Sequence, residues 1–72
     1  KIYPVPAAKG QLTVESESEP LLNIEIYNVS GKRVLIDNGD GNQSKQIDIS
    51  SLPAGIYFVK VEGYGLSKFI IQ

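Results

Sequence analysis

The sequence predicts an all-β fold: an antiparallel β-sandwich of about seven short strands with Greek-key connections. Turn-forming residues recur about every eight to twelve positions, and the segments between them alternate polar and apolar side chains. No segment shows the apolar period of a helix. At 72 residues the chain can form one small domain, residues 1–72, which we expect to be part of a longer protein.

The first two predicted strands cover residues 2–5 and 11–15. Pro4 and Pro6 have no backbone N–H to donate, so we expect the first strand to lie at a sheet edge. Residues 11–15 alternate polar and apolar side chains, as a half-buried strand does. The segment 16–20 is polar and acidic and ends in proline, which predicts a loop.

The third predicted strand contains an inward-facing apolar row, Leu22, Ile24 and Ile26. The next apolar residues fall on the other parity, which predicts a β-bulge near Asn28. Residues 28–31 begin with Asn and end with Gly, a pattern typical of a type I turn closed by a left-handed glycine. This turn predicts a hairpin.

The returning strand of the hairpin is predicted at residues 32–37, and another alternating strand at 45–49. Between them, residues 38–42 are rich in Asn, Asp and Gly and predict a bare hairpin loop. An EF-hand calcium loop is not supported. Counted from the start of this loop, its sixth residue is Gln43 and its twelfth is Ile49, where the pattern requires Gly and Glu.

A Leu-Pro-x-Gly turn opens directly into a β-branched and aromatic strand at residues 56–62. Tyr57 is placed to hydrogen-bond back to the backbone just upstream, as in the tyrosine corner of immunoglobulin-like domains, with Leu52 filling the core beneath it. We therefore expect an immunoglobulin-like sandwich. A turn at 63–65 and a last strand at 66–71 complete the chain.

The composition argues against catalysis and metal binding. The chain has no His and no Cys, so it lacks the commonest general base, metal ligand and thiol nucleophile. Glu15, Glu17 and Glu19 lie in or beside a polar loop, where a solvated charge cluster is favoured. We expect no enzyme, no metal and no cofactor. Seven basic and eight acidic residues predict no nucleic-acid-binding stripe, and no apolar run is long enough for a transmembrane helix.

Four segments, taken in order, resemble one known family. Residues 2–6 resemble its Tyr-Pro-Asn-Pro opening, and residues 24–34 resemble its hairpin with central Ile-Tyr and Gly-Lys pairs. Residues 47–61 are similar to its Ser-Leu-Pro-Ala-Gly-Val-Tyr segment, and residues 68–71 to its basic-then-apolar last strand. Over essentially the whole chain the sequence therefore resembles the C-terminal sorting domain of proteins exported by the type IX secretion system of Bacteroidetes.

Two positions depart from the family's pattern. Val5 stands where the family usually has Asn, which removes any role specific to that amide. Gln72 stands where a basic residue is frequent in related domains. Neither departure changes the predicted fold.

The resemblance implies a secretion signal rather than a catalyst. Such a domain directs its cargo protein across the outer membrane through the type IX system, after transit through the periplasm, to the cell surface or the medium. The implied partners are the outer-membrane translocon, its shuttle proteins and a surface sortase. The sortase is expected to remove the domain, with the cargo attached to anionic lipopolysaccharide.

The terminal strand is the predicted recognition segment, because a strand at a sheet edge can pair with a partner strand and present its side chains. The candidate recognition residues are Lys60, Lys68, Phe69, Ile70, Ile71 and Gln72. The family-motif residues, for which we expect a mainly structural role, are Pro4, Pro6, Gly31, Leu52, Pro53, Gly55 and Tyr57. The same edge could pair two copies into a homodimer.

A second hypothesis is an accessory immunoglobulin-like or carbohydrate-binding module of an extracellular protein. Its signature would be a cluster of exposed aromatic side chains on one sheet face. The aromatic residues of this chain are scattered over different segments, and Tyr64, in a Gly-Tyr-Gly turn, is the one we expect to be most exposed.

Overall fold

The computed structural model describes residues 2–8, 10–16 and 19–72, and only the backbone of residues 3–8. Within these ranges the chain is all-β, and no helix is long and apolar enough to cross a membrane. The seven strands found there are β1 (Ile2–Ala8), β2 (Gln11–Glu15), β3 (Asn23–Asn28), β4 (Arg33–Asn38), β5 (Ser44–Asp48), β6 (Gly55–Val61) and β7 (Gly65–Ile71). The predicted all-β class and the number of strands are confirmed.

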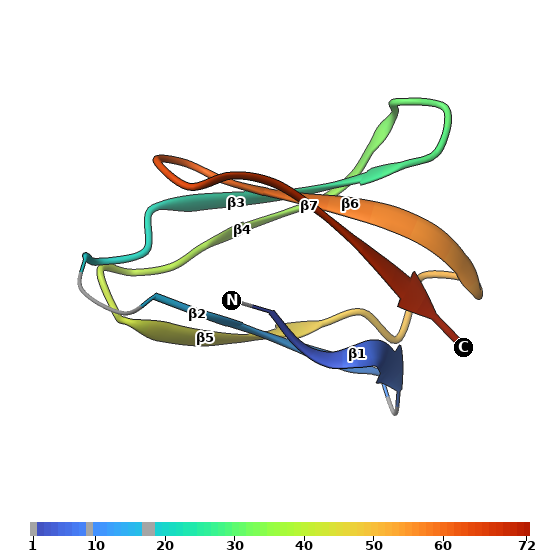
Figure 1. Ribbon diagram of the computed structural model, residues 1–72, viewed down its shortest axis with the longest axis horizontal. Coiled ribbons are helices and arrows are strands. Elements are labelled where there is room, and N and C mark those ends of the chain that lie inside the picture. Colours follow the sequence, from blue (N-terminus) through green and yellow to red (C-terminus); the bar gives the residue numbers. More distant parts are fainter. Residues whose placement is uncertain (1, 9, 17–18) are drawn as a thin grey trace.

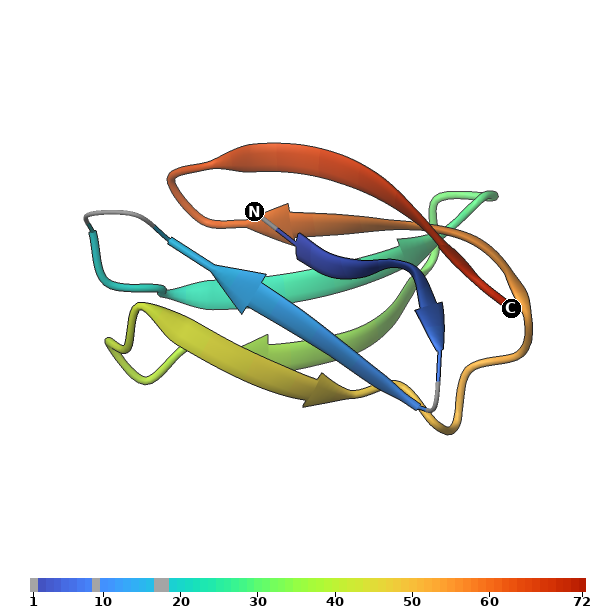
Figure 2. The same ribbon diagram turned by 60° about the horizontal axis from the view of Figure 1, so that its bottom comes forward.

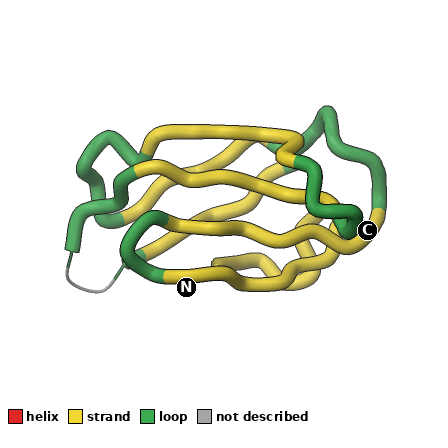
Figure 3. Tube along the Cα trace, turned by 90° about the horizontal axis from the view of Figure 1, so that it is seen from above, coloured by secondary structure: helices red, strands yellow, loops and turns green. Residues whose placement is uncertain are grey.

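The strands pack as two layers, and loops gather at the two ends of the sandwich (Figures 1 and 3). Hydrogen bonding joins them in the order β4-β3-β6-β7-β1-β2-β5. The first four strands in this order form a four-stranded layer, and β1, β2 and β5 form a three-stranded layer. Neighbouring strands pair antiparallel, except for the contact between β1 and β7. This arrangement is an immunoglobulin-like Greek-key sandwich.

Strand β1 is an end strand of the three-stranded layer, as predicted, and it also joins this layer to the other through a contact with β7. It pairs with β2 at Ile2, Tyr3 and Ala8, with a register shift between Tyr3 and Ala8. Ala7 pairs in parallel with Ile71, and Figure 2 shows β1 passing close to the last strand. Pro4 and Pro6 cannot donate ladder hydrogen bonds and lie where the pairing with β2 is interrupted. Strand β1 therefore contacts both layers.

The core lies between the two layers and contains no buried charged residue among those described. Its buried side chains are Leu12, Val14, Leu21, Ile24, Ile26, Ile47, Ile49, Tyr57, Val59, Val61, Phe69 and Ile71. Leu22, predicted to face inward, is exposed, and its neighbour Leu21 is buried instead. Leu21 precedes β3, in the segment that crosses between the layers, where strand parity no longer decides which side chain faces the core.

The hairpin between β3 and β4 has the predicted turn. The N–H of Gly31 donates to the carbonyl of Asn28 at 3.0 Å, and Gly31 has φ 88°. The Asn28 side chain accepts hydrogen bonds from the N–H of Ser30 and of Lys32. The predicted bulge near Asn28 is present, between the pairs Ile26–Leu35 and Tyr27–Arg33, but the extra residue lies in the partner strand β4. Val34 is the extra residue.

The loop at residues 38–42 crosses between the layers, so the predicted hairpin was wrong. Strands β4 and β5 lie at opposite ends of the strand order and do not pair. The loop packs against Leu21, whose carbonyl accepts from the N–H of Gly41 at 3.1 Å. A Cβ at Gly39 would lie 2.3 Å from the Cβ of Leu21. Glycine therefore permits the contact that carries the chain from one layer to the other.

The tyrosine corner is confirmed. The hydroxyl of Tyr57 donates to the carbonyl of Pro53 at 2.7 Å, and the Tyr57 side chain is 6% exposed. Its ring stacks on Phe69 of β7, with centroids 5.9 Å apart. Leu52 packs against the core, as expected. Gly55, at the start of β6, has φ 153°, which a side chain would strain.

We expect Tyr57→Phe to destabilise the domain by about 1 kcal/mol, because it removes one hydrogen bond while keeping the packed ring. For a domain of this size such a loss lowers Tm by about 4–8 °C. Thermal unfolding followed by circular dichroism measures it. The control is Tyr27→Phe, whose hydroxyl lies on the outer face, and which should lower Tm less. Equal losses in the two variants would contradict the corner's role.

Candidate recognition surface

The outer side of the four-stranded layer, here called the four-stranded face, carries the candidate site. Directly paired residues of neighbouring strands project on the same side of a sheet. One row across the face consists of Ile36, Glu25, Lys60 and Leu66, from β4, β3, β6 and β7 in that order. The face therefore combines side chains that are far apart in the sequence.

A second row places Tyr27, Phe58 and Lys68 side by side, and a third pairs Ile56 with Ile70. Tyr27 and Phe58 are half-buried on this face. Apolar residues thus occupy outward positions in β4, β6 and β7, although the opposite side of each strand already supplies the core.

Four aliphatic side chains on the four-stranded face are largely exposed. Ile36 is 57% exposed and Leu66 62%, while Ile56 and Ile70 are 44% and 42% exposed. Ile56 and Ile70 are direct cross-strand neighbours, whereas Ile36 and Leu66 lie at the two ends of a row with Glu25 and Lys60 between them. Exposed apolar side chains interspersed with charged ones in this way are compatible with an interaction surface.

The outer side of the three-stranded layer has a different character. The positions that alternate with buried Leu12 and Val14 are all polar, as are their partners on β5. These outward residues are Gln11, Thr13, Glu15, Ser44, Gln46 and Asp48. The two faces of the sandwich are therefore chemically distinct.

The carboxylate of Glu25 lies at the centre of the four-stranded face. It accepts a hydrogen bond from the Tyr27 hydroxyl at 2.6 Å and pairs with the Arg33 guanidinium at 3.3 Å. The Tyr27 hydrogen bond, followed by the charges of Arg33 and Lys60, lowers the pKa of Glu25, and partial burial opposes the shift. The same hydrogen bond raises the pKa of Tyr27.

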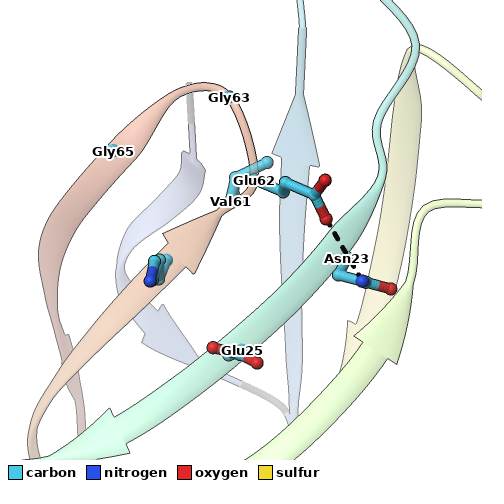
Figure 4. Close-up of a pocket in the computed structure, with 7 residues that line it drawn as sticks. Asn23, Glu25, Val61, Glu62, Gly63 and Gly65 are labelled. Atoms are coloured by element: carbon cyan, nitrogen blue, oxygen red, sulfur yellow. Dashed lines mark hydrogen bonds between the residues drawn. The ribbon is translucent and has the colours of Figure 1, made fainter.

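An open depression adjoins the face where β3 begins and β6 ends (Figure 4). It has a volume of about 330 Å³ and is lined by Asn23, Glu25, Lys60, Val61, Glu62, Gly63 and Gly65. The amide of Asn23 donates to the carboxylate of Glu62 at 3.1 Å. Among the residues that line it, no pair forms a nucleophile with its base.

The structure separates the predicted recognition residues into two groups. Lys60, Lys68 and Ile70 are exposed on the four-stranded face, and Gln72 is exposed after the end of β7. The side chains of Phe69 and Ile71 are 1% and 8% exposed and belong to the core. Burial therefore removes these two side chains from the surface that a partner can contact in the folded domain.

Strand β7 is the end strand of the four-stranded layer, as expected for the terminal strand, and β1 continues the strand order beside it at Ile71. It pairs with β6 along its length and with β1 at Ala7–Ile71. The outermost strands are β4 and β5. The bulge at Val34 interrupts the edge of β4, and Lys45 of β5 is in register with buried Val14, on the inner side of its strand. Bulges and inward charges of this kind discourage edge-to-edge pairing.

The exposed tyrosine of the β6–β7 turn serves as an internal contact. Tyr64 is 48% exposed, but its hydroxyl lies 2.6 Å from Oγ of Ser16 and 3.3 Å from the carbonyl of Glu19. These contacts tie the β2–β3 loop to the β6–β7 turn. Glu17, from the same acidic loop, lies outside the described residues. Among the described residues, no group of three or more Asp, Glu, His or Cys side chains could hold a metal ion.

Sequence reasoning missed Ile36, Ile56 and Leu66. For Ile36 and Ile56 the signal was present, because the runs at residues 34–36 and 56–59 are continuously apolar instead of alternating. Leu66, between Gly65 and Ser67, has no such signal. A strand that is apolar at both parities buries one face in the core and offers the other to a further contact.

The fold defines the structural class: an immunoglobulin-like β-sandwich, here with exposed aliphatic side chains on its four-stranded face. The family model "Secretion system C-terminal sorting domain" matches residues 1–72. The chain belongs to this family, the C-terminal sorting domains of the type IX secretion system, which are sorting signals and not a known enzyme family. Membership implies a signal for export to the cell surface or the medium, and interaction with the secretion system.

A solved structure of the CBM51-2 and INT domains of ZmpB from Clostridium perfringens has a similar fold, with a TM-score of 0.64 at 18% identity. The match covers 94% of this chain and 17% of that structure's chain. At this identity the likeness supports the immunoglobulin-like fold alone. No curated protein matches the chain significantly.

The lowered pKa of Glu25 predicts a pH dependence. Its ionised form is favoured by folding, so its stabilising contribution is present above about pH 4.5 and is lost as the pH falls through the lower folded-state value. An NMR titration of the Glu25 carboxyl should give a midpoint below 4.5. In Tyr27→Phe the midpoint should rise. An unchanged midpoint in that variant would contradict the assignment of the hydrogen bond as the main cause.

Proposed function

We propose that residues 1–72 form the single C-terminal sorting domain of a longer secreted protein and direct that cargo across the outer membrane through the type IX secretion system. The observation that carries the proposal is the family match over the whole chain. The four motif segments that resemble the family fall on one folded unit, so the signal is read from a folded domain. The domain acts as an address label and has no catalytic activity.

The cargo crosses the periplasm before the outer-membrane translocon and its shuttle proteins engage the domain. A surface sortase then removes the domain, and the cargo becomes attached to anionic lipopolysaccharide. These steps rest on family membership. The exposed four-stranded face supports the need for a partner, because it offers aliphatic side chains that the isolated domain leaves in water.

Among the predicted recognition residues, Lys60, Lys68, Ile70 and Gln72 are accessible to the translocon. Phe69 and Ile71 act by packing the core and thereby holding β7 in place. The two roles are separable by experiment, since exposed residues can be changed without unfolding the domain.

A fusion experiment tests the proposed function. Residues 1–72 are attached to the C-terminus of a periplasmic fluorescent reporter, in a bacterium with an intact type IX system and in a mutant without the translocon. We expect fluorescence at the surface or in the medium only in the intact strain. Retention of a well-folded fusion in the periplasm of both strains would contradict a sorting function.

Deleting residues 68–72 should abolish export by unfolding the domain. The deletion removes Phe69 and Ile71 from the core, and truncation of one large core side chain alone costs about 3–5 kcal/mol. That is comparable to the whole stability of a small domain, at about 0.05–0.15 kcal/mol per residue. Circular dichroism of the purified variant measures folding. A folded truncation that is not exported would instead support a linear signal in the last residues.

An accessory carbohydrate-binding module is the alternative function. The neighbouring aromatic side chains of Tyr27 and Phe58 on the four-stranded face are the observation that favours it. A glycan-binding screen of the purified domain distinguishes the two functions, and a glycan that binds through Tyr27 would support the module.

A homodimer through β7 is a second assembly that we retain as a proposal. Its support is the short contact of β7 with β1, at Ile71, which leaves the side of residues 66–70 opposite β6 open to a further strand. Sedimentation over a range of concentrations tests it.

A further inference from the structure

We infer that the four-stranded face, and not the end of the chain, is the surface by which this domain binds its secretion-system partner. The partner surface it fits is apolar and carries acidic side chains opposite Lys60 and Lys68. The inference rests on the proposed function and adds to it the residues that bind and the chemistry of what they bind.

Exposed aliphatic side chains from three strands lie on the four-stranded face. Leu66 is the direct cross-strand neighbour of Lys60, and Ile70 of Ile56. Ile36 flanks the same face on β4. Each is more than two-fifths exposed, so covering them would remove apolar surface from water at about 25 cal/mol per Å². The outward residues of β2 and β5, the strands of the other layer whose side chains the structure describes, are all polar, which favours the four-stranded face as the side on which a partner binds.

The charges on this face are not all paired with one another. Glu25 is occupied by the Tyr27 hydroxyl and the Arg33 guanidinium. Among the described residues, neither Lys60 nor Lys68 forms an ion pair. Lysine lays its aliphatic stem along apolar surface and keeps its ammonium group at the periphery. Lys60 lies beside Glu25 in the same row and interacts with its charge, whereas Lys68 has the aromatic Phe58 as its cross-strand neighbour. Within the described part of the chain neither lysine is held in an ion pair, so an acidic partner surface complements both ammonium groups.

Strand addition at an outermost edge is less favoured as the mode of binding. The bulge at Val34 interrupts the β4 edge, and Lys45, bonded to Asp40 at 3.1 Å, lies on the inner side of the β5 edge. Two accessible features lack such protection: the four-stranded face and the adjoining side of β7 before Ile71. Of these, the face offers the exposed aliphatic and lysine side chains.

The test uses the reporter fusion with substitutions on the face and matched controls elsewhere. Lys60→Glu and Lys68→Glu reverse the charge on the face, and Lys32→Glu makes the same change in the exposed β3–β4 turn. Leu66→Ser removes an exposed aliphatic side chain from the face, and Val29→Ser does so in the turn, where Val29 is 68% exposed. Thermal unfolding of each purified domain establishes that the variants are folded.

We expect the double variant Lys60→Glu/Lys68→Glu to reduce export at least about tenfold, since opposed like charges in an interface cost several kcal/mol and about 1.4 kcal/mol corresponds to a factor of ten. Leu66→Ser should reduce it about threefold to tenfold, by loss of one apolar contact. Lys32→Glu, Val29→Ser and the conservative Lys60→Arg/Lys68→Arg should be exported like the unsubstituted fusion.

Normal export of the folded face variants would overturn the inference while leaving the sorting function intact. Equal losses in the turn controls would also overturn it. Failure of the unsubstituted fusion to be exported would instead overturn the proposed function, and the inference with it. Sedimentation of the same purified domains tests whether a second copy of the chain binds the face instead. If the domain is a dimer, and the face substitutions dissociate it without reducing export, the face is a dimer interface and the inference is overturned.

Discussion

The rest of the structure depends on the position of Tyr57. Its hydroxyl binds the carbonyl of Pro53, which fixes the turn by which the chain returns from β5 to β6. Its ring packs on Phe69, which attaches the last strand to the core. A 72-residue chain without cysteine has no disulfide to hold these segments together. Instead, the buried Tyr57 side chain joins the turn between β5 and β6, through its hydroxyl, to the terminal strand β7, through its ring.

This constraint determines what β7 can present. Because Phe69 and Ile71 face the core, the outward residues Leu66, Lys68 and Ile70 are held in fixed register with β6. The surface that they form exists only in the folded domain. A sorting signal of this kind is a property of a sheet face, assembled from four strands, and a short terminal peptide could not reproduce it.

Much of the fold could be predicted from the sequence because its signals are local. The Asn28–Gly31 turn and the Tyr57 corner each depend on residues within a few positions of one another, and both were predicted correctly. The alternation that defines β2 is equally local. The overall class followed from these elements and from the spacing of the turns.

What could not be predicted depends on contacts between distant segments. The contact of β1 with the other layer requires β7 to lie beside Ala7. No local sequence feature near Pro4 and Pro6 predicts that β7 is the neighbouring strand. The burial of Leu21 in place of Leu22 depends on the approach of Gly39 from the crossing loop. In the candidate site, Lys60, Lys68 and Ile70 were predicted from the sequence. That they lie on the same sheet face as Ile36 depends on the strand order β4-β3-β6-β7, which the sequence does not reveal.

The most direct test of a face-based signal is to map the contact by NMR. An isotope-labelled domain is titrated with the purified, detergent-solubilised outer-membrane translocon, and line broadening is recorded for each backbone amide. The account predicts broadening concentrated at Ile36, Lys60, Leu66 and Ile70, with the outward residues of β2 and β5 unaffected. Broadening confined to Gln72 and the chain end, or to the three-stranded layer, would contradict it.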